Sequence, residues 1–89
     1  MLFMVIGTWE PDKVQEITKR AGEKGAGVPE GVRVIGEWTD AAGRRIVRVL
    51  EADDATSLLV TSLGWNDLMT IEVFPVVGLE SSIDTAGSV

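Results

Sequence analysis

A β-hairpin in the middle of the chain constrains the fold more than any other feature. Two runs suited to strands, Val32–Thr39 and Arg45 to about Glu51, are separated by a short turn that begins with Asp40 and ends with Gly43. Aspartate favours the start of a tight turn, and glycine tolerates the positive φ that such turns need. Elements on both sides of this hairpin must therefore pack around it.

Each side of the hairpin holds one strand and one helix. The first strand is apolar on both faces, which is typical of a central strand. The helices show apolar residues every three or four positions, and they begin near a proline or an aspartate, as helices often do. The four flanking elements are a strand at Leu2–Gly7, a helix from Pro11 to between Arg20 and Lys24, a helix at about Asp54–Leu63 and a strand at Met69–Val77.

The order β-α-β-β-α-β predicts an α+β fold of the ferredoxin-like type. Such a fold has a four-stranded antiparallel sheet with two helices on one face. The length of 89 residues, with 45% hydrophobic residues, suits one domain with a single core. We expect this domain to span residues 1–79 and residues 80–89 to form a mobile C-terminal tail.

The composition excludes several kinds of site. The chain has no cysteine and no histidine, so disulfides, thiolate nucleophiles, imidazole bases and Cys/His zinc sites are impossible. The adjacent Asp53 and Asp54 suit a helix start better than a metal site, and neither a metal nor a cofactor is expected. The net charge of −6 argues against nucleic acid as a partner. Without a membrane-spanning run or a signal peptide, the expected location is the cytoplasm, away from membranes.

Alternation along the strands predicts two different sheet faces. The face under the helices is expected to carry Val32, Val34, Trp38, Val47, Val49, Ile71 and Val73. The second face holds five large apolar side chains, and leaving them in water forgoes roughly 8–15 kcal/mol. A second copy of the chain is the simplest cover, so a homodimer is expected. The candidates for its interface are Ile35, Ile46, Leu50, Phe74 and Val76.

The same second face carries four charged residues: Arg33, Glu37, Arg48 and Glu72. Enclosed in a dimer, these charges must pair with each other or with a ligand. One hypothesis is a pocket in which Arg48 holds an anionic or carbonyl oxygen and a glutamate takes a proton. The other hypothesis is that two ion pairs at the interface fix the dimer register. Among the tryptophans, Trp38 is expected in the core and Trp65 at a helix junction.

Several segments of the sequence are similar to one family of small proteins. They are Met1–Ile6, Pro29–Val32, Trp38–Asp40, Glu51–Asp54, Trp65–Leu68 and Glu72–Val76. Together they resemble the DUF3303 family of bacterial and archaeal proteins over roughly residues 1–79. The resemblance implies a ferredoxin-like fold and a dimeric α/β barrel. It supplies no catalytic residue, and the second helix of this chain is shorter and poorer in charge than expected for the family.

Three hypotheses for the function follow. The first is a dimeric barrel that binds a small organic molecule between its sheets without catalysis. The second is a cofactor-independent monooxygenase or isomerase, which rests on analogy with other dimeric α/β barrels. The third is a structural interaction module with no ligand. A mostly apolar cavity lined by one of the charged residues would favour the first two.

Overall fold

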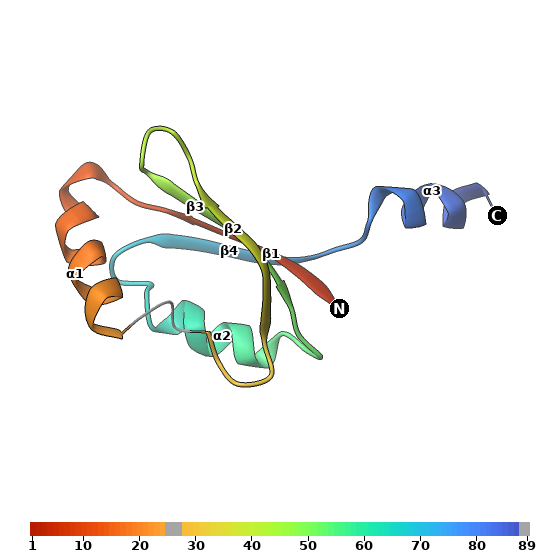
Figure 1. Ribbon diagram of the computed structural model, residues 1–89, viewed down its shortest axis with the longest axis horizontal. Coiled ribbons are helices and arrows are strands. Elements are labelled where there is room, and N and C mark those ends of the chain that lie inside the picture. The colour runs from red at the N-terminus through yellow and green to blue at the C-terminus, as the bar shows by residue number, and fades with distance from the viewer. Residues whose placement is uncertain (25–27, 88–89) are drawn as a thin grey trace.

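The computed structural model describes residues 1–24 and 28–87 and contains one four-stranded antiparallel sheet (Figure 1). The strands lie in the order β2-β3-β1-β4. In chain order the elements are β1 Leu2–Thr8, the 3₁₀ turn η1 Pro11–Lys13, α1 Val14–Lys24, β2 Arg33–Thr39, β3 Arg45–Glu51, α2 Thr56–Leu63, β4 Thr70–Val76 and α3 Leu79–Gly87. The predicted ferredoxin-like α+β fold is confirmed.

The turn of the central hairpin forms as its sequence predicts. The Asp40 carboxylate accepts hydrogen bonds from the backbone N–H groups of Arg44 at 2.9 Å and Arg45 at 3.1 Å. These bonds, led by that from Arg44, lower the pKa of Asp40. Gly43 has a φ of 71°, a conformation that side chains with a Cβ rarely adopt. The hairpin thus joins β2 to β3 and fixes their pairing.

The core lies between the sheet and the helices. Phe3, Leu50, Ala52 and Leu58 form its buried cluster, and Val5, Val32, Val34 and Val73 pack against them. Helix α2 lies below the sheet, and α1 stands at the end of the sheet where β1 finishes (Figure 1). The sheet therefore has one face toward the helices and one face without a helical layer.

The pairing register corrects the predicted faces of β3. Leu50 lies opposite Phe3 and Arg48 lies opposite Val5, so both point toward the helices. The sequence prediction placed Val47 and Val49 there instead, because they are aliphatic and their neighbours include an arginine. The larger side chains face the helices, because Ile46 and Leu50 bury more apolar area than the two valines do.

A β-bulge corrects the faces of β2. The register shifts between Val34 and Gly36, and an extra residue reverses the alternation beyond it. Val34 therefore faces the helices, as predicted, whereas Glu37 joins it there and Trp38 turns to the other side. Trp38 is 60% exposed, so its prediction as a core residue is wrong. Its ring lies over Gly36, where a Cβ atom would come within 2.6 Å of the indole.

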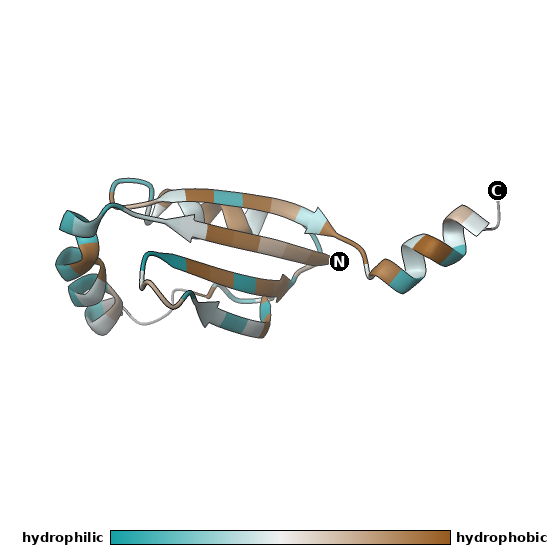
Figure 2. Cartoon of the chain, turned by 90° about the horizontal axis from the view of Figure 1, so that it is seen from above, coloured by the Kyte–Doolittle hydropathy of each residue, from teal (hydrophilic) through white to brown (hydrophobic). Residues whose placement is uncertain are grey.

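The sheet face opposite the helices, here called the open face, is still apolar. Figure 2 looks onto it, and no helix lies in front of the strands. Its apolar residues follow from the register: Leu2, Met4, Ile6, Trp38, Val47, Val49, Phe74 and Val76. Phe74 and Val76 were assigned to this face from the sequence, and the structure confirms their placement.

The C-terminal segment forms the helix α3, Leu79–Gly87, within the part of the chain that the sequence predicted as a mobile tail. Helix α3 extends away from the sheet in both views (Figures 1 and 2), and none of its residues is buried. Its apolar Leu79 and Ile83 are four positions apart, a helical spacing that the surrounding small residues obscure. Within residues 1–24 and 28–87, no helix has the length and apolar character needed to cross a membrane.

Candidate functional site

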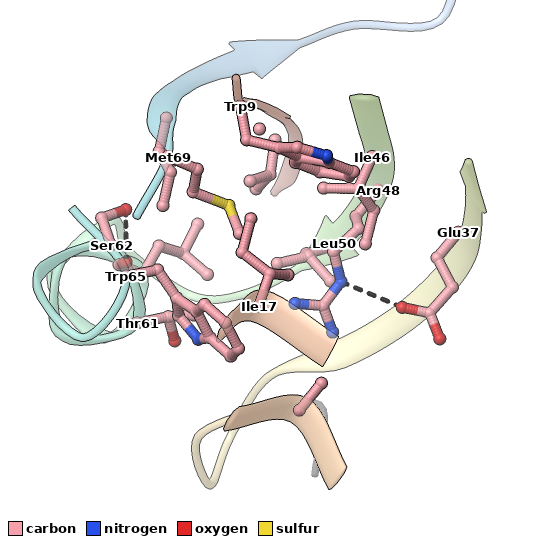
Figure 3. A pocket seen from close by; sticks show the side chains of 15 residues that line it. Trp9, Ile17, Glu37, Ile46, Arg48, Leu50, Thr61, Ser62, Trp65 and Met69 are labelled. Carbon is pink, nitrogen blue, oxygen red and sulfur yellow. Dashed lines mark hydrogen bonds and ion pairs between the residues drawn. The ribbon is translucent and has the colours of Figure 1, made fainter. Parts of the chain in front are cut away.

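A cavity of about 160 Å³ lies between the sheet and the two helices (Figure 3). Its sheet side is formed by Val5, Gly7, Ile46, Arg48, Leu50 and Ile71. Helix α1 contributes Ile17 and Ala21, and α2 contributes Leu58, Thr61 and Ser62. Trp9, Trp65 and Met69 come from the segments that follow β1 and α2. Most of these side chains are apolar, so the cavity favours an apolar occupant.

Gly7 opens one side of the cavity. It is a central-strand residue without a side chain, and it points toward the helices beside Ile46. A Cβ atom at this position would lie 2.9 Å from the Met69 sulfur and 3.0 Å from Ile46 Cγ2. The absence of that side chain lets Met69 and Ile46 approach the strand, and their side chains line the cavity (Figure 3).

Arg48 is the buried charged residue of the cavity wall. Its side chain is 8% exposed, and its Nε lies 3.1 Å from the Glu37 carboxylate, whose side chain is 48% exposed. Figure 3 shows this ion pair at the side of the cavity facing β2. A guanidinium presents five N–H donors along two edges, so it is able to bind more than one oxygen-bearing group. The cavity thus combines an apolar lining with one arginine–glutamate ion pair.

Arg20 connects α1 to the segment between α2 and β4. Its guanidinium donates two hydrogen bonds of 2.8 Å to the Asp67 carboxylate and one of 3.1 Å to the Gly64 carbonyl. It also lies 5.5 Å from the centre of the Trp65 ring, within the range of a cation–π contact. These contacts hold one wall of the cavity against another, since Trp65 lines the space that α1 covers.

The Arg20–Asp67 pair predicts a pH-dependent stability. Its hydrogen bonds hold the pKa of Asp67 at about 2, below the ordinary 3.8. A carboxyl group whose pKa falls on folding stabilises the protein above its ordinary pKa, and this contribution is lost as the pH falls through the folded value. Asp67→Asn is therefore expected to be less stable than wild type at pH 7, with a difference that shrinks between pH 4 and pH 2. Urea denaturation at several pH values measures it, and a difference independent of pH would contradict the assignment.

The four charged residues predicted to share one face do not. Glu37 and Arg48 lie together at the cavity, on the helix side of the sheet. Arg33 pairs with Glu51 at 3.0 Å near one end of β2, with both side chains largely exposed. Glu72 alternates with Ile71 and Val73 and lies on the open face. The prediction that all four residues cluster on one face is wrong. Two of them, Glu37 and Arg48, line the cavity on the helix side of the sheet.

The apolar residues predicted for a dimer interface are divided in the same way. Ile46 and Leu50 face the helices and line the cavity, because β3 has the opposite orientation to that predicted. Ile35 lies at the β-bulge and is 49% exposed. Phe74 and Val76 remain on the open face. A chamber between two sheets, as expected from the sequence, would therefore not contain Arg48.

Sequence reasoning missed most of the cavity lining. Three separate segments supply Trp9, Ile17, and the pair Trp65 and Met69, and only the packing of the helices brings them together. One signal was present. Every second residue along β3 belongs to one face, which runs from Ile46 through Arg48 and Leu50 to Ala52. The large apolar side chains of this face mark it as the buried one. Within the described part of the chain, no three acidic side chains gather into a group that could hold a metal ion.

The chain matches a family model described as "Domain of unknown function (DUF3303)" over residues 1–88. Among solved structures, it is similar to an uncharacterized NIPSNAP domain protein from Burkholderia xenovorans. The two are 17% identical, with a TM-score of 0.48, over 89% of this chain and 97% of that chain. No curated protein matches the sequence significantly. The family match confirms the resemblance seen in the sequence, and the chain belongs to the DUF3303 family.

Proposed function

We propose that this protein binds a small organic acid in the cavity between the sheet and helices α1 and α2. The apolar part of the ligand would fill the cavity, and its carboxylate would meet the guanidinium of Arg48. The observation that carries this proposal is a buried arginine in the wall of an otherwise apolar cavity. Such a combination is typical of sites that recognise an apolar body with one polar group.

The size of the cavity limits the ligand. An apolar protein cavity of about 150 Å³ holds one benzene molecule. The cavity here has about 160 Å³, so it suits one aromatic ring or a short branched chain.

The guanidinium of Arg48 favours a carboxylate over a neutral polar group. A hydrogen bond between a guanidinium and a carboxylate is charge-assisted and about twice as strong as a neutral one. In a site shielded from water this attraction is screened less than at the surface. Glu37 is half-exposed, so it can keep its contact with water while Arg48 also binds a ligand oxygen. The Glu37–Arg48 pair would then orient the guanidinium toward the cavity.

An NMR titration tests this proposal with three internal reporters. Trp9 and Trp65 line the cavity, whereas Trp38 lies on the open face. We expect benzoate to shift the indole N–H signals of Trp9 and Trp65 and to leave that of Trp38 unchanged. Benzyl alcohol, which has the ring without the carboxylate, should shift the same two signals only at higher concentration. Shifts confined to Trp38, or no shifts with benzoate, would contradict the proposed site.

We also propose that the open face pairs with the open face of a second copy. Its central strands carry Met4, Ile6, Val47 and Val49, and soluble monomers rarely leave a continuous apolar sheet face in water. A two-fold axis would cover the same face on both copies. This keeps the predicted homodimer but changes its interface, since Ile46 and Leu50 are replaced by residues of β1 and the valines of β3.

Phe74→Arg tests the pairing. Phe74 is 38% exposed on the open face, so the fold should accept the arginine while two facing copies should not. We expect wild type to sediment at about twice 9.6 kDa and the variant at about 9.6 kDa. Val60→Arg on the outer side of α2, where Val60 is 64% exposed, is the control and should remain a dimer. A monomeric wild type, or a monomer caused by the control alone, would refute this interface.

A further inference from the structure

Helix α3 has an apolar side that its own chain leaves in water. Val77 and Leu79 are 71% and 76% exposed, and Ile83, one helical turn beyond Leu79, is 61% exposed. The helix has nine residues. Isolated helices shorter than about 12 residues are marginal in water, so most helices of this length depend on packing. A surface that covers Leu79 and Ile83 would supply that packing.

The exposed area of the whole chain also indicates a missing partner. A compact monomer of this mass exposes about 5,100 Å² by the usual size scaling, whereas this chain exposes 6,238 Å². The excess is larger than the roughly 800 Å² that each partner buries in an interface of standard size. The radius of gyration is 14.8 Å, against about 12 Å for a compact domain of this length. The projecting α3 contributes to both differences (Figure 1).

We propose that α3 is an exchanged arm, which packs against strand β2 of a second copy of this chain. This inference rests on the proposed pairing of open faces. The sheet order β2-β3-β1-β4 places β2 at the edge farthest from the strand that carries the arm. Trp38 and Ile35 of β2 are 60% and 49% exposed, and they offer a large apolar seat for Leu79 and Ile83.

Charge favours this seat over the other exposed apolar surface of the chain. Helix α3 carries Glu80 and Asp84 and has no basic residue in its last turn. Arg33 begins β2 and Arg45 begins the neighbouring β3, and the two glutamates of these strands are paired, Glu51 with Arg33 and Glu37 with Arg48. The seat is therefore close to neutral in charge. The outer side of α2 is also apolar, at Leu59, Val60 and Leu63. That helix follows Asp53 and Asp54 directly, and these acids would repel the acidic arm.

A spin label on α3 tests the arm directly. The chain has no cysteine, so Ser81→Cys provides one attachment site for a nitroxide. The full-length chain that carries the nitroxide is mixed and refolded with ¹⁵N-labelled wild-type chain, so that signals come only from the copy without the nitroxide. We expect the Trp38 indole signal and the amide signals of β2 to be broadened. Broadening centred on Leu59 to Leu63, or broadening absent from a mixed dimer, would overturn the proposal.

A matched pair of variants measures the contribution of the arm. Ile83→Glu adds a carboxylate to the apolar side of α3, and Ser81→Glu adds one to the opposite side of the same helix. We expect Ile83→Glu to raise the dimer dissociation constant about tenfold or more, because burial of one such side chain accounts for that factor. Ser81→Glu should change it less than about threefold by the same conversion. Equal effects would refute the arm, whereas a monomeric wild type would refute the pairing itself.

Discussion

Replacing Leu58 with alanine is expected to lower the free energy of unfolding by about 3 kcal/mol, the usual result for a buried leucine. Leu58 is 2% exposed and packs in the cluster with Phe3, Leu50 and Ala52. Its removal deletes apolar contacts and enlarges a cavity that already exists beside it. In a domain of this size, such a loss is a large part of the total stability.

The neighbouring Leu59 provides the matched control. It lies on the same helix and is 56% exposed on the outer side. Leu59→Ala removes the same atoms from a position that water already reaches, so a change within about 0.5 kcal/mol is expected. Urea denaturation of both variants measures the difference. Equal losses would mean that α2 does not present Leu58 to the sheet as described.

Arg48→Met is expected to weaken benzoate binding about 10-fold to 100-fold, because charge-assisted hydrogen bonds contribute roughly 1.5–3 kcal/mol. Methionine keeps a long apolar side chain but removes the charge. Removing one partner of a buried ion pair is costly where the other charge is left buried and unpaired. Here Glu37 is half-exposed and can be hydrated. The variant should therefore fold with a stability close to that of wild type and retain its weak binding of benzyl alcohol.

Arg33→Met is the control for this effect. Arg33 also belongs to an arginine–glutamate pair, but its side chain is 70% exposed and lies outside the cavity. Exposed pairs of this kind contribute little to stability. Its replacement should leave benzoate affinity unchanged within about twofold, which corresponds to about 0.4 kcal/mol. Similar losses in both variants would point to a general effect of net charge and against a carboxylate site at Arg48. Isothermal titration calorimetry provides the affinities.

The topology could be predicted from local patterns, because each of its signals lies within one segment. Asp40 and Gly43 mark the hairpin, and its position between two strand–helix pairs leaves few alternative arrangements. Side-chain orientation was harder to predict. In β3 the alternation allows two orientations, and Arg48 made the wrong one more attractive. In β2 the bulge before Gly36 reversed the pattern, and this glycine inside a strand, a common mark of a bulge, was a local signal that the alternation alone did not use.

The candidate site could be predicted only in part. The sequence singled out Arg48 and Glu37 as a pair with functional potential, and the structure brings them together. It could not place Trp9, Ile17 and Met69 beside them, because their approach depends on how helices pack on the sheet. Gly7, whose lack of a side chain lets Met69 approach the strand, was predicted only as the last residue of the first strand. The enzymatic hypothesis stays a prediction, since no feature of the cavity specifies a reaction.

Intermolecular nuclear Overhauser effects between benzoate and the protein would test the central claim most directly. We expect contacts from the ring protons to the methyl groups of Ile17 in α1 and Ile46 in β3, which both line the cavity. We expect none to Val47 and Val49, which alternate with Ile46 and Arg48 along β3 and point to the open face. Contacts to the two valines without contacts to the isoleucines would place the ligand between two sheets and contradict the account.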